Sequence, residues 1–234
     1  MNKTLKQKTE TGSALIYILI AIALLAALTI AFMDSSGQQT QNQNTFRTQS
    51  DLEQQVDFIR SAVQECVLTH SRGDNTIVTT GGGATDAGAN RAYPIKPNST
   101  HFTGATIGAA ANRNVANIRC PGDPGDDQNH AMIFGGTSGK FFPATPSLFN
   151  DWQWYNGDDG VFFWISTTKS DAFLKTALEK LDAKYADCEA SYIDATGGAV
   201  DMDFDSPDQA TCAAGSLCFR VFMIRNASAV PTCP

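Results

Sequence analysis

The longest uninterrupted apolar stretch of the chain lies close to its N-terminus. Residues 14–33 carry no charged side chain, and Thr29 is the clearly polar residue among them. As a helix rising about 1.5 Å per residue, this stretch is about 30 Å long, the thickness of a bilayer's hydrocarbon core. Three lysines lie within residues 1–12, and Asp34 is the first charged residue after the stretch. We therefore expect a single-pass inner-membrane helix, with the N-terminus cytoplasmic and the following chain periplasmic or extracellular.

A second, different apolar pattern follows this stretch. Residues 34–51 are rich in Gln, Asn, Ser and Thr, and apolar residues then return with a 4-3-4 spacing. The apolar positions are Leu52, Val56, Ile59 and Val63. This spacing marks one face of a helix. It predicts a single long helix over residues 13–70, with Gly37 as a weak point. A polar stalk followed by a separate helix explains the same pattern.

The remaining chain, residues 71–234, is expected to form an α+β head. Residues 71–150 are rich in Gly and Pro, which predicts loops, with short strands at 75–80 and 130–134. Residues 160–166, 199–205 and 217–225 have the β-branched and aromatic content of strands, which favours an antiparallel sheet.

One further helix is predicted over residues 170–190, with Ser170 or Asp171 as its N-cap. Its expected buried stripe is Phe173, Leu174, Ala177, Leu178, Leu181 and Tyr185. The domain organisation is therefore a basic leader (1–12), a long N-terminal helix (13–70) and a head (71–234).

Six cysteines lie at positions 66, 120, 188, 212, 218 and 233, and none forms a C-x-x-C pair. In a chain with an export signal this pattern favours up to three disulfides, including one near the C-terminus, over a zinc site. The connectivity is open at this point. Free buried thiols in a cytosolic protein are the alternative.

Net charge and motifs argue against most enzymatic and nucleic-acid functions. The chain has a formal net charge of −7 and no basic stripe, so a nucleic-acid partner is not expected. The three histidines are far apart, and neither G-x-S-x-G nor H-E-x-x-H is present. Residues 135–140 (GGTSGK) lack the spacing of a phosphate-binding loop and are expected to form a turn. We therefore expect a protein without enzymatic activity.

One acidic run has the opening of a calcium-binding loop. Asp201, Asp203 and Asp205 follow a D-x-D-x-D pattern, and calcium prefers oxygen ligands from a short loop. The alternative is a strand in which Met202 and Phe204 face the core and the aspartates face water. The strand interpretation is favoured, and calcium is the one candidate cofactor. An aromatic cluster within residues 152–164 is expected to pack in the core, and a ligand groove is its alternative.

The N-terminal segment resembles the processing site and helix of type IV pilins and type II secretion pseudopilins. A short basic leader ends at Gly12, and the apolar helix begins at Ser13. In that family a prepilin peptidase cleaves after the glycine and the new N-terminus is methylated. The family usually has Glu at the fifth mature position, where this chain has Tyr17. That glutamate pairs with a neighbouring subunit's N-terminal amine inside the fibre.

The resemblance implies a minor or tip subunit of a type IV pilus or type II secretion fibre. Its partners would be other pilin or pseudopilin subunits, contacted through the N-terminal helix, together with the membrane and the prepilin peptidase. A signal-anchored periplasmic binding or adhesion module is the alternative.

Overall fold

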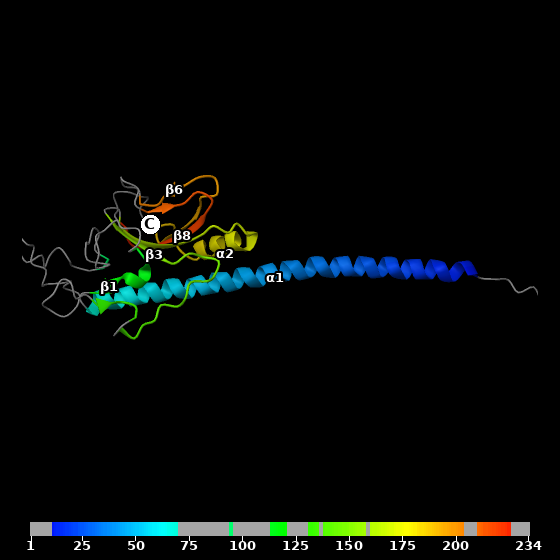
Figure 1. Ribbon diagram of the computed structural model, residues 1–234, viewed down its shortest axis with the longest axis horizontal. Helices are drawn as coiled ribbons and strands as arrows, with labels where there is room; N and C mark the ends of the chain where they lie inside the picture. The colour runs from blue at the N-terminus through cyan, green and yellow to red at the C-terminus, as the bar shows by residue number, and fades with distance from the viewer. Residues whose placement is uncertain are drawn as a thin grey trace, which may run out of the picture. The chain divides into compact units, whose positions relative to one another are not determined.

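The computed structural model describes residues 11–69, 94–95, 113–120, 131–135, 138–157, 160–203 and 210–225. Within helix α1, side chains are described for residues 15–30 and 39–69. The chain forms two compact units, residues 1–44 and 45–234. The described part of the protein is α+β, as expected from the sequence (Figure 1). The predicted short strand at 75–80 lies outside the described residues.

Helix α1 (Thr11–Thr69) is continuous over 59 residues. The long helix predicted over residues 13–70 is therefore confirmed, and the stalk interpretation of residues 34–51 is wrong. The helix also continues through Gly37, which was predicted to be a weak point. Gln and Arg are good helix formers, and this composition offsets the roughly 1 kcal/mol that a single interior glycine costs.

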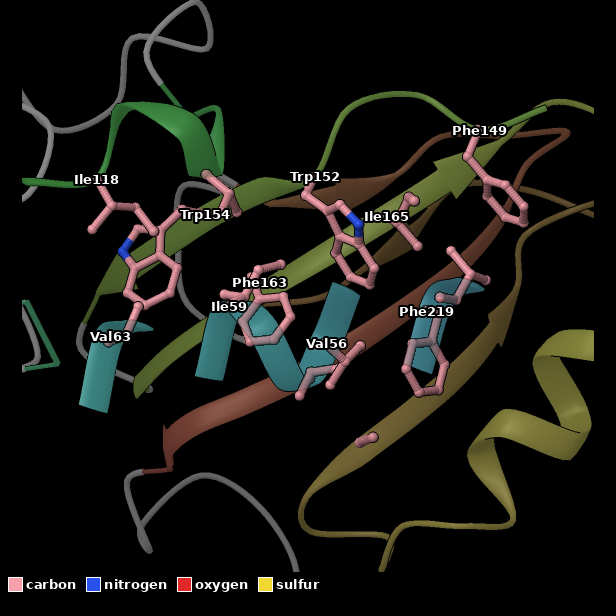
Figure 2. Close-up of a cluster of buried hydrophobic side chains, with 14 of the residues drawn as sticks. Val56, Ile59, Val63, Ile118, Phe149, Trp152, Trp154, Phe163, Ile165 and Phe219 are labelled. Atoms are coloured by element: carbon pink, nitrogen blue, oxygen red, sulfur yellow. The ribbon is translucent and has the colours of Figure 1, made fainter. Parts of the chain in front are cut away.

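The four positions of the 4-3-4 spacing are all fully buried, so the second apolar pattern is confirmed as a core-facing stripe. Figure 2 shows Val56, Ile59 and Val63 directed towards aromatic and aliphatic side chains of the sheet. Trp152 and Phe163 meet edge to face there, with ring centroids 5.4 Å apart. Each such buried side chain contributes about 1.5–3 kcal/mol, so the stripe fastens this part of α1 to the sheet.

The central sheet is antiparallel and four-stranded, with strand order β3-β4-β8-β5. Its strands are β3 (Gln153–Gly157), β4 (Gly160–Thr167), β5 (Ala190–Asp194) and β8 (Leu217–Arg225). The strands predicted at 160–166 and 217–225 are confirmed as β4 and β8, which pair along the whole length of β4. β3 and β5 were not predicted, because short strands with mixed polarity carry a weak period-2 signal.

Gly160, at the start of β4, must be a glycine for two reasons. Its φ is +137°, a backbone conformation that side chains disfavour, and a Cβ there would lie 2.3 Å from the carbonyl oxygen of Ile224. The close approach of β4 to β8 at this corner therefore depends on the absence of a side chain.

Side chains alternate between the two faces of the sheet. In β8, Leu217, Phe219 and Val221 join the core against α1, whereas Cys218 and Phe222 join a second cluster on the opposite face. That second face is covered by the hairpin of β6 (Val200–Asp201) and β7 (Thr211–Cys212). Figure 1 shows β6 on the side of β8 away from the carboxyl end of α1. Both faces of the sheet are therefore buried.

Helix α2 (Ala172–Asp182) is shorter than the predicted 170–190. Asp171, one of the two predicted candidates, is its N-cap, although its side chain accepts no capping hydrogen bond. The four buried residues of α2 all belong to the predicted stripe. The helix ends early because residues 183–189 form turns that lead into β5, where Ala190 pairs with Val221.

The remaining described elements are short. They are the 3₁₀ helix η2 (Val115–Asn117) and the strand pair β1 (Arg119–Cys120) and β2 (Ala131–Met132). β2 falls within the predicted strand 130–134. The described residues of the GGTSGK segment form a turn, as expected: the amide of Gly135 donates to the carbonyl oxygen of Lys140 at 2.6 Å.

Disulfides are present, as predicted. Cys66 is bonded to Cys120, and Cys212 is bonded to Cys218. Cys188 is also disulfide-bonded, and none of the five cysteines that the structure describes is free, so the alternative of free thiols is wrong for these five. The Cys212–Cys218 bond joins β7 to β8 close to the C-terminus, where a disulfide was expected.

Candidate functional site

The first half of α1 is apolar and uncovered on every side. Each Leu, Ile and Tyr side chain between residues 15 and 30 is more than half exposed. Six of these residues, 15–20, are consecutive, and at 3.6 residues per turn they occupy the whole circumference of the helix. The hydroxyl of Thr29 donates hydrogen bonds within the helix to the carbonyl oxygens of Leu25 and Ala26, at 2.7 and 2.9 Å. A helix that is apolar all round requires a surrounding apolar medium or partner helices.

Among the residues that the structure describes, no helix reaches the combined length and apolar character of a membrane span. The membrane-embedded part of the predicted helix therefore stays a prediction. Gly12 and Ser13, the predicted processing residues, lie in the first turn of α1. Tyr17, which occupies the position of the family's glutamate, is 69% exposed.

The acidic run differs from its predicted form. β6 covers Val200–Asp201, so the strand predicted over 199–205 is wrong at residues 202 and 203, and residues 204 and 205 lie outside the described residues. Met202 is buried as expected, but Asp203 is fully buried too and does not face water. Its Oδ2 accepts a hydrogen bond from the amide of Ala210 at 2.7 Å, and Oδ1 of Asp201 accepts from the amide of Asp203 at 3.1 Å. Asp203 therefore turns inwards and fixes the connection between β6 and β7.

A buried arginine in β8 attracts the inward-facing carboxylate of Asp203. Arg220 is only 6% exposed, and its guanidinium donates to the carbonyl oxygen of Met202 and, at 3.2 Å, to Oγ of Ser191. It also lies over the ring of Phe222, 4.5 Å from the centroid. The pKa of Arg220 is lowered to about 10, chiefly by burial and also by the nearby charge of Arg225, while Asp201 and Asp203 oppose the shift. A buried cation needs nearby carboxylates, and the acidic run supplies them.

The attraction to Arg220 accounts for the positions of Asp201 and Asp203 without a metal ion. Within the described part of the chain, no group of three or more His, Cys, Asp or Glu side chains could hold a metal. Asp205 lies outside the described residues, as do the three histidines. Calcium binding by Asp201, Asp203 and Asp205 therefore stays a prediction.

The aromatic cluster of residues 152–164 is part of the core. Its members are Trp152, Trp154, Tyr155, Phe162, Phe163 and Trp164. All six are buried, and they divide between the two faces of the sheet. The core interpretation is therefore confirmed, and these side chains do not line an open groove.

A groove does occur where α1 meets the segment that precedes β3. It has a volume of about 510 Å³ and is lined by residues 51–58 of α1 and 141–146 of that segment. Phe141 at its edge is 77% exposed. Beneath it, Gln55 donates to the carbonyl oxygen of Ala144 at 3.0 Å and accepts from Nε1 of Trp152 at 2.6 Å.

Sequence reasoning missed both Gln55 and Arg220, although each leaves a signal. Gln55 falls on the apolar face set by Leu52 and Ile59, where a polar residue indicates a buried hydrogen bond. Arg220 interrupts the otherwise apolar strand LCFRVFMIR, where a charge indicates a buried partner. The partners themselves come from distant parts of the chain and could not be identified from these signals.

Comparisons with known proteins give no relative: no family model, curated protein or solved structure matches the chain.

Proposed function

We propose that this chain is a non-enzymatic, pilin-like structural subunit that is held in the inner membrane by α1 until it assembles into a fibre. The observation that carries the proposal is the change of character within one helix. Residues 15–30 of α1 expose apolar side chains all round, and residues 52–66 carry a stripe that the protein's own sheet covers. The first part has the surface needed to contact lipid or the helices of other subunits. The second part holds the head.

The head supports the same function. An antiparallel sheet packed on the end of a long helix, with two disulfides in the described residues, gives a rigid body suited to an extracytoplasmic environment. The fibre would be a type IV pilus or a type II secretion fibre.

We propose a minor or tip position in the fibre, because this chain has Tyr17 where the family usually has a glutamate. A buried amine inside an apolar helix bundle requires a carboxylate partner, and Tyr17 supplies none. At the tip no subunit lies above this one, so the missing carboxylate has no neighbouring amine to pair with.

A signal-anchored binding or adhesion module is the second candidate. The observation in its favour is the groove beside residues 51–58 of α1, with the exposed aromatic ring of Phe141 at its edge. Such a module would keep its leader and would act as a single chain.

The processing site distinguishes the two candidates. The experiment is N-terminal sequencing and intact mass of the protein from hosts with and without a prepilin peptidase. The pilin-like function predicts a mature chain that begins at Ser13 in the first host alone. Gly12→Val should abolish this cleavage, whereas Gly37→Ala, a glycine change within the same helix, should not. Retention of Met1 in both hosts would favour the anchored module.

Assembly is tested separately by co-purification with sheared fibres. The proposal predicts that the processed protein is present at low copy number in such fibres. A processed protein that is never found with other subunits would contradict the structural role.

A further inference from the structure

Two disulfides have both of their cysteines described by the structure, and these two bonds differ in their surroundings. Cys212 and Cys218 are completely buried. Cys66 and Cys120, in contrast, both line a cavity of about 170 Å³ at the carboxyl end of α1. Cys66 is 6% exposed and Cys120 is half-buried, so Cys120 is the more exposed residue of the two. A disulfide reacts with a thiol only where the attacking sulfur can reach it.

Two side chains of opposite charge line the same cavity. Nζ of Lys140 lies 2.7 Å from Oε1 of Glu65, and both residues contribute to the cavity wall. An ammonium group beside a disulfide favours exchange, because both the attacking and the leaving sulfur are thiolates. The carboxylate has the opposite effect. The rest of the wall includes Ala62, Met132 and Ile133, which provide an apolar surface for a small alkyl thiol.

We propose that Cys66–Cys120 is a thiol-exchange site that accepts low-molecular-weight thiols, and that Lys140 promotes and Glu65 restrains the reaction. A thiolate attacks Sγ of Cys120 and forms a new S–S bond to it. The Cys66–Cys120 bond breaks, and Sγ of Cys66 leaves with the electron pair as a thiolate. A second thiol then attacks the mixed disulfide, so that both cysteines are reduced and the two small thiols depart as their own disulfide.

The size of the cavity determines the class of thiol. Water occupies about 30 Å³ per molecule in the liquid, so about 170 Å³ admits a fragment of several heavy atoms. A folded protein does not fit such a space. The exchange releases the carboxyl end of α1 from β1, which is 54 positions along the chain. It leaves the central sheet and the Cys212–Cys218 bond intact.

The experiment measures the rate at which each cysteine becomes reactive in the full-length protein in detergent. 2-Mercaptoethanol, a small alkyl thiol, is added at graded concentrations, the reaction is stopped with N-ethylmaleimide, and the modified cysteines are mapped by peptide mass spectrometry. We expect Cys66 and Cys120 to be modified at least about tenfold faster than Cys212 and Cys218. Equal rates for the two pairs, or reduction by a protein dithiol such as thioredoxin but not by 2-mercaptoethanol, would overturn the proposal.

Two substitutions with opposite expected effects test the charges. Lys140→Met should slow exchange at Cys120, and Glu65→Gln should accelerate it, each by about three- to tenfold. Lys169→Met, which removes a lysine that does not line the cavity, is the matched control. Exchange at Cys188 should be unchanged in all three variants. Urea unfolding of the oxidised variants shows whether the head is intact. If Lys140→Met and Glu65→Gln leave the rate at Cys120 unchanged in folded protein, the assigned roles are wrong.

Discussion

Both halves of helix α1 carry apolar side chains, but these side chains have different surroundings in each half. In residues 52–66 the apolar side chains form one stripe, and the sheet covers that stripe completely. In residues 15–30 they occupy every side of the helix, and all the large ones are exposed. A narrow stripe can be buried by one partner surface, whereas a fully apolar circumference cannot. The stripe of residues 52–66 therefore finds its partner within the head, whereas the apolar circumference of residues 15–30 is exposed in the structure.

The largest effect is expected from a charge in the covered half. Ile59→Asp removes a fully buried side chain and places a carboxylate among Trp152 and Phe163, which supply no counter-charge. The free energy of unfolding of the head should fall by about 5 kcal/mol or more. Urea unfolding followed by tryptophan fluorescence measures this loss. Ser61→Asp, two residues away on the exposed side of the helix, is the control and should shift the transition little. Similar transitions for both variants would show that the stripe does not hold the head.

The same substitution in the uncovered half should have a different consequence. Ile22→Asp places a charge near the middle of the apolar stretch, which costs about 2.5–3.5 kcal/mol in membrane insertion. We expect the protein to move out of the carbonate-resistant membrane fraction, with the urea unfolding of the head unchanged. Ile22→Ala should remain in that fraction. If Ile22→Asp stays there too, the apolar surface of residues 15–30 has a partner other than lipid.

A smaller effect is expected at the polar residue within the covered stripe. Gln55→Ala removes the acceptor for the buried Nε1 of Trp152 and the donor to the carbonyl of Ala144. Leaving these groups without partners should lower the free energy of unfolding by about 1–3 kcal/mol. Gln54→Ala, at the exposed neighbouring position, is the control and should change it little. An unchanged transition for Gln55→Ala would mean that water replaces both hydrogen bonds.

The smallest effect is a pH dependence of the head's stability, which membrane association through residues 14–33 should not share. Burial raises the pKa of Asp182 in the folded head, and its carboxylate accepts a hydrogen bond from the amide of Tyr192 at 2.9 Å. Between the unfolded pKa near 3.9 and the raised folded pKa, the folded state holds more of this proton. Stability contributed by this group is therefore lost as pH rises through that window.

Asp182→Asn keeps an oxygen acceptor for Tyr192 but has no charge to bury. We expect a flatter stability profile above pH 4 and a difference at pH 7 of less than about 1 kcal/mol. Urea midpoints measured between pH 4 and 7 test this. A steeper profile in the variant would contradict the assigned cause. Residues 14–33 contain no carboxylate or basic group, so membrane association should not respond to pH in this range.

The accuracy of the sequence-based expectations follows the strength of each local pattern. The 4-3-4 stripe of α1 and the strands β4 and β8 were predictable because long runs with a clear period or high β propensity leave few alternatives. The strand predicted at 199–205 failed at residues 202 and 203, because alternation of Asp with Met and Phe does not reveal which side chains lie opposite. The buried Arg220 attracts Asp203 inwards, and that attraction arises only when β8 and the β6–β7 hairpin are stacked.

The sequence by itself predicted two apolar surfaces of different width in the N-terminal region, followed by an α+β head with disulfides. Periodicity and composition are local properties, and they suffice for those conclusions. Only the tertiary structure decided that Cys66 pairs with Cys120, that Gln55 accepts a hydrogen bond from Trp152, and that Asp203 is buried near Arg220. Each of these contacts joins residues far apart in the chain. Their free energies depend on burial and distance in the folded state, which no local pattern specifies.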